Sequence, residues 1–86
     1  MSPRVTIIGK PDCHLCHEAR AQVSAVCGEL GIEWEERSIL DDPRLYDEYW
    51  ERIPVILIDG RIHDYWRVDP RRLRGALTDN RSDSSD

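Results

Sequence analysis

The chain is poor in several residue types, and each shortage narrows what the protein can be. Its 86 residues include no phenylalanine, one methionine and three cysteines. Three cysteines are too few, and odd in number, for a small domain held together by disulfide bonds. No stretch approaches the roughly 20 apolar residues that cross a membrane, and no charged and apolar leader precedes the first strand-like segment. We therefore expect a cytoplasmic protein that does not act at a membrane.

Basic charge is also scarce. Lysine and arginine together number 12 against 17 aspartates and glutamates, so the formal net charge is −5. The basic residues cluster only at Arg71, Arg72 and Arg74, whereas a nucleic-acid-binding domain normally has a dominant basic face. We therefore expect no nucleic-acid partner, and we interpret these arginines as the solvated surface of a helix. The length suits one domain, which we expect to be a monomer.

Apolar periodicity and turn residues predict seven elements in the order βαβαββα. The predicted strands cover residues 4–8, 32–38, 55–58 and 61–66, and the predicted helices cover 13–30, 42–50 and 69–77. Asp59-Gly60 is a strong two-residue hairpin signal between the last two strands. The order therefore predicts an α/β fold in which helices cover both faces of a four-stranded mixed sheet. We expect this domain to span residues 1–79, followed by a disordered polar tail over 80–86.

The expected core follows from the same patterns. In the first helix, an apolar stripe at three- and four-residue spacing predicts the buried face; it comprises Leu15, Ala19, Val23, Val26 and Leu30. We also expect Trp50 and Trp66 to fill the core. The alternative for Trp66, together with Tyr65 and His63, is to line a groove beside Cys13 and Cys16. Cys27 lies eleven residues beyond Cys16 on this helix, about 16 Å away, which is too far for a disulfide bond. We therefore interpret Cys27 as a small buried apolar residue.

Cys13 and Cys16 carry the chemistry that the sequence predicts. They are separated by two residues at the start of the first helix, where unpaired backbone N–H groups and the helix dipole favour an anion. The thiolate is the reactive form of cysteine, so we predict that Cys13 is the nucleophile. Cys16, one turn further along, is placed to attack a mixed disulfide at Cys13 as the resolving thiol. Lys10 and His14 would add positive charge beside them.

Residues Lys10 to Cys16, which read Lys-Pro-Asp-Cys-His-Leu-Cys, resemble the active-site stretch of glutaredoxins, and Ile53-Pro54-Val55 resembles that family's cis-proline segment. The resemblance covers about residues 4–78 and implies a thioredoxin-like fold. It also implies a thiol–disulfide oxidoreductase that needs no bound cofactor. It assigns substrate-binding or tuning roles to Lys10, Pro11, His14, Ile53 and Pro54, and a cis peptide bond to Pro54. The implied partners are a disulfide-containing protein or a low-molecular-weight thiol such as glutathione.

The chain departs from the glutaredoxin pattern in two places. Glutaredoxins have a Gly-Gly pair after the fourth strand, in a segment that helps to hold glutathione, whereas residues 62–69 here contain no glycine. The residues between the cysteines are His14 and Leu15 in place of the usual Pro-Tyr. Asp69 lies where the family has a ligand-binding acid, and the Pro70 that follows it indicates a helix cap instead. The chain therefore resembles a divergent glutaredoxin-like group.

Three other interpretations use the same cysteines. Cys13 to His17 also match the Cys-x-x-Cys-His pattern of c-type haem attachment, which would require export and a second axial ligand. Cys13, Cys16 and His17 offer three zinc ligands, with His63 or Cys27 as a possible fourth. An iron–sulfur cluster shared between two chains is known in the glutaredoxin family. The alternative function is therefore a metal or iron–sulfur carrier.

Overall fold

Strand β1 (Val5–Gly9) is an inner strand of the sheet in a computed structural model that describes residues 4–78 of the chain. The strand order is β2-β1-β3-β4. Strand β2 (Trp34–Ser38) runs parallel to β1, whereas β3 (Val55–Ile58) pairs with β1 in the antiparallel direction. Strand β4 (Arg61–Tyr65) is antiparallel to β3. The sheet is therefore mixed and four-stranded, as the sequence predicted.

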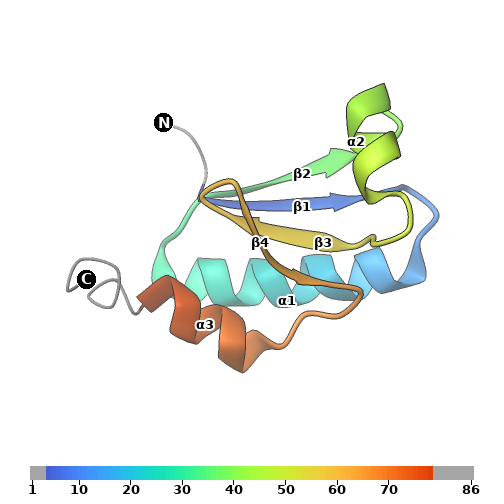
Figure 1. Cartoon of the computed structure of the whole chain (residues 1–86). Helices are drawn as coiled ribbons and strands as arrows, with labels where there is room; N and C mark the ends of the chain where they lie inside the picture. Colours follow the sequence, from blue (N-terminus) through green and yellow to red (C-terminus); the bar gives the residue numbers. More distant parts are fainter. Residues whose placement is uncertain (1–3, 79–86) are drawn as a thin grey trace.

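Three helices cover this sheet. Helix α1 (His14–Leu30) and helix α3 (Pro70–Thr78) lie side by side on one face, and helix α2 (Pro43–Tyr49) lies on the other (Figure 1). The element order is βαβαββα, which confirms the predicted thioredoxin-like architecture. No helix within residues 4–78 is long and apolar enough to span a membrane.

Alternation along the strands divides the core between the two faces, because successive side chains of a strand point to opposite sides. On β1, Val5 and Ile7 pack with α1 and α3, and Ile8 packs with Tyr49 of α2. The larger cluster also contains Cys27, which is fully buried. The prediction that Cys27 serves as a small apolar core residue is therefore confirmed.

Turn and cap residues end the elements where the sequence predicted. Gly31 closes α1 in the left-handed conformation with φ of 69°, which glycine adopts without a steric penalty. The side chains of Asp42 and Asp69 accept hydrogen bonds from backbone amides in the first turns of α2 and α3. Asp59 and Gly60 form the hairpin turn with φ of 52° and 85°. The helix cap therefore explains the position of Asp69 without any role in ligand binding.

Two predicted core tryptophans are instead exposed, so that part of the prediction was wrong. Trp50 is 52% exposed because Tyr49 takes the inward position and Trp50 stacks on Tyr46 along the outer face of α2. Trp66 is 54% exposed, and its indole N–H donates to the Glu51 carbonyl oxygen at 3.0 Å. This hydrogen bond holds the Trp66 ring beside the loop that follows α2, so Val68 packs against the core instead.

Smaller departures concern the edges of elements. Leu15 was expected in the apolar stripe of α1, but it is 38% exposed and Cys16 occupies the inward position. Strand β2 begins at Trp34 rather than at residue 32, and β4 ends at Tyr65 rather than at residue 66. The tail predicted over 80–86 lies outside the described residues.

His63 on β4 predicts a pH dependence of folding stability. Its side chain is half-buried and its Nε2 atom has no hydrogen-bond partner among the described residues. Burial lowers the pKa of His63 below the ordinary 6.5, and the positive charge of Arg72 lowers it further, against a smaller opposing effect of Asp64. The unfolded chain therefore binds a proton at His63 at a higher pH than the folded chain does, so stability falls as the pH drops below about 6.5.

We expect the His63→Gln variant to remove part of this acid sensitivity. Urea unfolding midpoints measured from about pH 7.5 to about pH 5.5 should fall more steeply for the wild type than for the variant. The difference in slope has an upper limit of about 1.4 kcal/mol per pH unit, the value for one proton. Parallel pH profiles would show that His63 titrates equally in both states.

Candidate active site

Cys13 is the N-cap of helix α1, and its sulfur takes part in the cap. Strand β1 ends at Gly9, and a turn brings the Cys13 amide to the Lys10 carbonyl oxygen at 3.4 Å. Cys13 has extended backbone angles, φ −96° and ψ 116°, and its Sγ accepts a hydrogen bond from the Cys16 amide at 3.2 Å. A helix N-terminus stabilises negative charge on a group held in this way.

The two thiols have different surroundings. Cys13 is half-buried and Cys16 is fully buried. Burial raises the pKa of Cys16 to about 12, and the neighbouring Cys13 sulfur adds to this rise. Cys16 is therefore a protonated thiol in the reduced protein, and of the pair only Cys13 is open to an incoming molecule. This difference agrees with the roles that the sequence predicted for the two residues.

Gly9 provides the space that the Cys16 side chain occupies. A Cβ atom at position 9 would lie 2.6 Å from Cys16 Sγ and 3.2 Å from Cys16 Cβ. Both distances are shorter than ordinary van der Waals contacts, so no side chain fits there without displacing the thiol. Glycine at the end of β1 thus fixes the sulfur against the backbone of the sheet.

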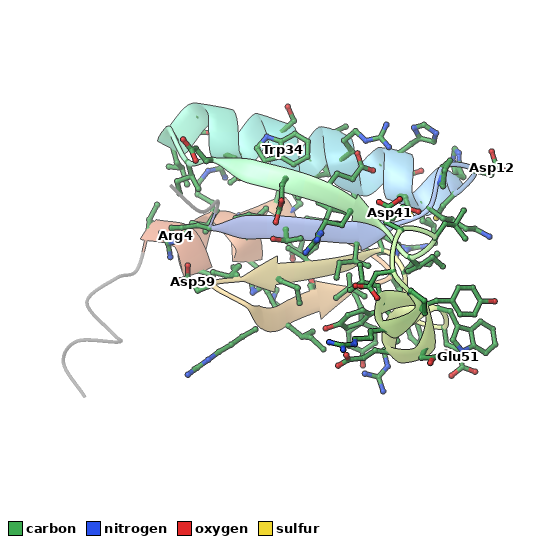
Figure 2. The ribbon with its side chains drawn as sticks, turned by 90° about the horizontal axis from the view of Figure 1, so that it is seen from above. Arg4, Asp12, Trp34, Asp41, Glu51 and Asp59 are labelled. Carbon is green, nitrogen blue, oxygen red and sulfur yellow. The ribbon has the colours of Figure 1, made fainter. Side chains whose placement is uncertain are left out.

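The Ile53–Pro54 segment lies at the same end of the sheet as the thiols. The peptide bond between the two residues is cis, as the resemblance predicted. Val55 pairs with Ile8, so Pro54 follows in register beside Gly9, which contacts Cys16. Asp12, Asp41 and Glu51 also lie at this end, opposite the end that carries Arg4 and Asp59 (Figure 2).

The remaining predicted residues lie in three different surroundings. Lys10 and Pro11 are exposed on the loop between β1 and α1. His14 is directed along the helix, where its Nε2 atom is 3.2 Å from a Glu18 carboxylate oxygen, and its side chain is 86% exposed. Ile53 packs with Ile8 and Tyr49 under α2. Their proposed effects on substrate binding and thiol reactivity stay predictions.

One charged pair between α1 and β2 was missed by the sequence reasoning. Arg20 of α1 holds Glu36 of β2 with two hydrogen bonds, Nε to Oε1 at 2.9 Å and Nη2 to Oε2 at 2.7 Å. This ion pair raises the pKa of Arg20. It borders a groove of about 270 Å³ that Gly9 and Lys10 also line. Cys16 and Arg20 are four residues apart on one helix. This spacing could have indicated that Arg20 lies on the same face of α1 as Cys16.

A second groove, of about 220 Å³, lies on the other side of α1. Leu15 and Glu18 line it from the helix, and Trp66 to Val68 line it from the segment before α3. Trp66 adopts φ of 71°, and its backbone amide donates to the Pro54 carbonyl oxygen at 2.8 Å. A positive φ is the conformation that glycine adopts most readily, and this segment is where glutaredoxins have Gly-Gly. The chain thus makes a left-handed turn with a tryptophan that projects beside the active site.

The metal-binding alternative finds no matching geometry in the described part of the chain. Within residues 4–78, no group of three or more His, Cys, Asp or Glu side chains is arranged to hold a metal ion. His17 lies instead beside Arg20, whose Nη1 atom is 3.3 Å from His17 Nδ1. Cys27 is enclosed in the core cluster between the sheet and the two helices α1 and α3. Among the residues that the structure describes, none of the three further ligands considered, His17, His63 and Cys27, forms a metal-binding group with Cys13 and Cys16.

The fold and the Cys-x-x-Cys helix start define a thioredoxin-like protein, and comparisons with known proteins agree. Residues 4–78 match the model of the family described as Glutaredoxin-like domain (DUF836). The chain belongs to this glutaredoxin-like family. An uncharacterized protein of Mycobacterium tuberculosis is 35% identical over 80 residues, which cover 87% of this chain and 82% of that protein.

Several solved structures have a fold similar to that of this chain. An X-ray structure of a protein from X. campestris has a TM-score of 0.70 and 31% identity, covering 85% of this chain and 93% of that one. A solution structure of a protein from Nitrosomonas europaea has a TM-score of 0.71 and 24% identity, and the match covers 90% of this chain and 93% of that one. Fasciola hepatica thioredoxin shares the fold, with a TM-score of 0.60, 20% identity and coverage of 86% and 76%.

The contact between Gly9 and Cys16 yields a prediction for stability. We expect Gly9→Ala to reduce the free energy of unfolding by about 1–3 kcal/mol, the usual cost of inserting an atom into a packed site. Urea unfolding of the reduced protein would measure this change. Most of the cost should disappear when Gly9→Ala is made in a Cys16→Ala background, because the sulfur is the atom that clashes. An equal cost in both backgrounds would show that the clash lies elsewhere.

Proposed function

We propose that the protein is a thiol–disulfide oxidoreductase in which Cys13 is the nucleophile and Cys16 the resolving thiol. The observation that supports this most directly is the asymmetry of the pair. Cys13 caps α1 with its sulfur on the Cys16 amide at 3.2 Å, whereas Cys16 is fully buried behind it. Membership of the glutaredoxin-like family supports the same function.

The reaction has two exchanges. In the first, the Cys13 thiolate attacks one sulfur of a substrate disulfide, forms a mixed disulfide and releases the other half as a thiolate. In the second, Cys16 attacks Cys13 in the mixed disulfide and releases the remaining half of the substrate. The substrate disulfide gains two electrons, and Cys13 and Cys16 lose two as they form their own disulfide. A cellular thiol reverses the sequence to restore the dithiol.

The substrate class that we propose is a disulfide in a protein or in a small molecule. The exposed aromatic side chains beside the cis-proline segment support access for such molecules. Tyr65 and Trp66 are 44% and 54% exposed, and the backbone amide of Trp66 donates a hydrogen bond to the Pro54 carbonyl oxygen. We place the protein in the cytoplasm, where thiols are kept reduced and a close cysteine pair is typically catalytic or metal-binding.

Trapping of intermediates tests this mechanism. We expect the Cys16→Ser variant, treated with glutathione disulfide, to accumulate a glutathione adduct on Cys13, because no thiol remains to resolve it. The Cys13→Ser variant should form no adduct, since its remaining thiols are buried. The wild type should pass to an internal disulfide with the loss of two hydrogen atoms. Mass spectrometry of peptides identifies each species.

Cys27 offers the matched control. Its side chain is fully buried in the core, and burial raises its pKa. The Cys27→Ala variant should therefore exchange disulfides at the rate of the wild type. Disulfide reduction that survives in the Cys13→Ser variant would refute the proposed mechanism.

A further inference from the structure

We propose that four exposed aromatic side chains form a docking surface for a protein substrate that carries arginine or lysine beside its disulfide. The inference rests on the proposed function and deepens it, because it selects a protein over a small molecule as the substrate. The four residues are Tyr46, Trp50, Tyr65 and Trp66, and we call them the aromatic ridge. They are four of the six aromatic residues of the chain, and all four are exposed. Exposed tryptophan and tyrosine side chains are typical of protein–protein interfaces.

A series of contacts joins the ridge into one surface. Tyr46 and Trp50 stack one turn apart on α2, with their ring centroids 6.3 Å apart and an angle of 10° between the ring planes. The carbonyl oxygen of Glu51, the residue after Trp50, accepts the indole hydrogen bond of Trp66 at 3.0 Å. Tyr65 packs edge-on against Trp66, with 5.0 Å between the ring centroids. The two aromatic pairs are therefore neighbours, although they come from distant parts of the sequence.

The ridge lies at the active-site end of the sheet. Helix α2 and the start of α1 are at the same end in Figure 1, and Figure 2 shows Glu51 at the end that also carries Asp12, the residue before Cys13. Trp66 lines the groove of about 220 Å³ together with Leu15, which stands between the two cysteines in the sequence. A polypeptide whose disulfide meets Cys13 can therefore extend over Trp66 toward α2.

The charge around the ridge indicates a basic partner. Residues 41–52 contain five acidic residues against two arginines, and none of these five carboxylates forms an ion pair with a residue between 4 and 78. Asp47 precedes Trp50 by three residues on α2, which makes the two neighbours on the helix surface, and Glu51 follows Trp50 directly. The α2 end of the ridge is therefore negatively charged, whereas its other end carries Arg67 next to Trp66.

Aromatic rings beside carboxylates suit an arginine or lysine of the partner. A guanidinium or ammonium group is attracted to the face of an indole or phenol ring, and the exposed Tyr46 and Trp50 rings offer such faces. The carboxylates of Asp47 and Glu51 supply the opposite charge beside the same rings. A basic side chain two or three residues from the substrate cysteine would thus be held at α2 while the disulfide lies at Cys13.

Two other occupants fit this chemistry poorly. A second copy of the chain would place the same carboxylates opposite each other, because a symmetric dimer uses the same patch on both subunits, and like charges across an interface are unfavourable. Glutathione disulfide carries a net negative charge at pH 7 and would be repelled in the same way. A basic segment of a protein is the occupant that the charge of the ridge favours.

Two peptide disulfides that differ only in charge test the docking surface. In each peptide, one cysteine is joined by a disulfide bond to 5-thio-2-nitrobenzoate, and it is flanked by arginines in one peptide and by glutamates in the other. Attack by Cys13 releases the coloured thiolate, and stopped-flow absorbance gives a second-order rate constant. We expect the reduced wild type to react about tenfold faster with the arginine peptide, since one exposed cation–π contact corresponds to about two- to fivefold. The ratio of the two rates should shrink in high salt.

Trp50→Ala tests the aromatic part of the ridge. We expect it to lower the ratio of the two rates about two- to fivefold. Ile62→Ala is the matched control and should keep the wild-type ratio, because Ile62 is an exposed apolar residue of β4 that pairs with Leu57 next to the hairpin turn. The intrinsic reactivity of each peptide is the same for every variant, so a change in the ratio reports on the ridge.

The double variant Asp47→Asn/Glu51→Gln tests the charge of the ridge, and it should also lower the ratio by about two- to fivefold. Glu33→Gln/Glu35→Gln removes the same number of charges from exposed residues outside the ridge and should keep the wild-type ratio. This control separates the ridge from the net negative charge of the whole chain. An equal loss in both double variants would overturn the docking surface, because net charge alone would then attract the peptide.

The remaining outcomes distinguish this inference from the proposed function. No reaction of the wild type with either peptide would refute the oxidoreductase function itself. Reaction with both peptides, at a ratio that Trp50→Ala and Asp47→Asn/Glu51→Gln leave unchanged, would overturn the docking surface alone. A wild-type ratio that falls as the protein concentration rises would show that a second copy covers the ridge, and it would also overturn the inference. Reaction with the glutamate peptide reports that each variant is folded around Cys13.

Discussion

The packing of the Cys16 sulfur against the backbone of Gly9 is the constraint on which the site depends. Because position 9 has no side chain, the first turn of α1 approaches the end of β1 closely enough to bury Cys16 completely. With Cys16 fixed, its amide is directed at the Cys13 sulfur, 3.2 Å away. The exposed position of Cys13 at the helix start thus follows from the buried position of its partner, and the two residues acquire different chemistry from one contact.

The same contact explains why the charged pair lies where it does. Cys16 faces inward, so the residue one turn later on that face, Arg20, is brought to the boundary between α1 and β2. Its guanidinium group binds the Glu36 carboxylate through two hydrogen bonds, the bidentate geometry common for arginine and carboxylate. A charged pair at this partly exposed boundary contributes little to stability by itself. Its structural effect is to join helix α1 to strand β2 through two side-chain hydrogen bonds.

The sequence predicted those features that depend on local residue type. Gly31, Asp42 and Asp69 end or begin helices through backbone conformation and capping that act over a few residues, and their predictions were confirmed. Trp50 and Trp66, which the sequence placed in the core, are instead exposed. Their positions follow from specific contacts that residue type alone does not predict. Trp50 stacks on the ring of Tyr46, and the Trp66 indole N–H donates to the Glu51 carbonyl oxygen. The Arg20–Glu36 pair was missed because it joins residues 16 positions apart on different elements.

The cap of α1 also links the chemistry of the site to the helix that carries it. Most helices are capped by an oxygen of Ser, Thr, Asp or Asn, whereas here the acceptor is the Cys13 sulfur. A charged acceptor makes a stronger hydrogen bond than a neutral one, so the first turn of α1 is best capped when Cys13 is a free thiolate. Formation of a disulfide at Cys13 would remove that charge. The reduced state is therefore the one in which the cap of α1 and its dipole act together.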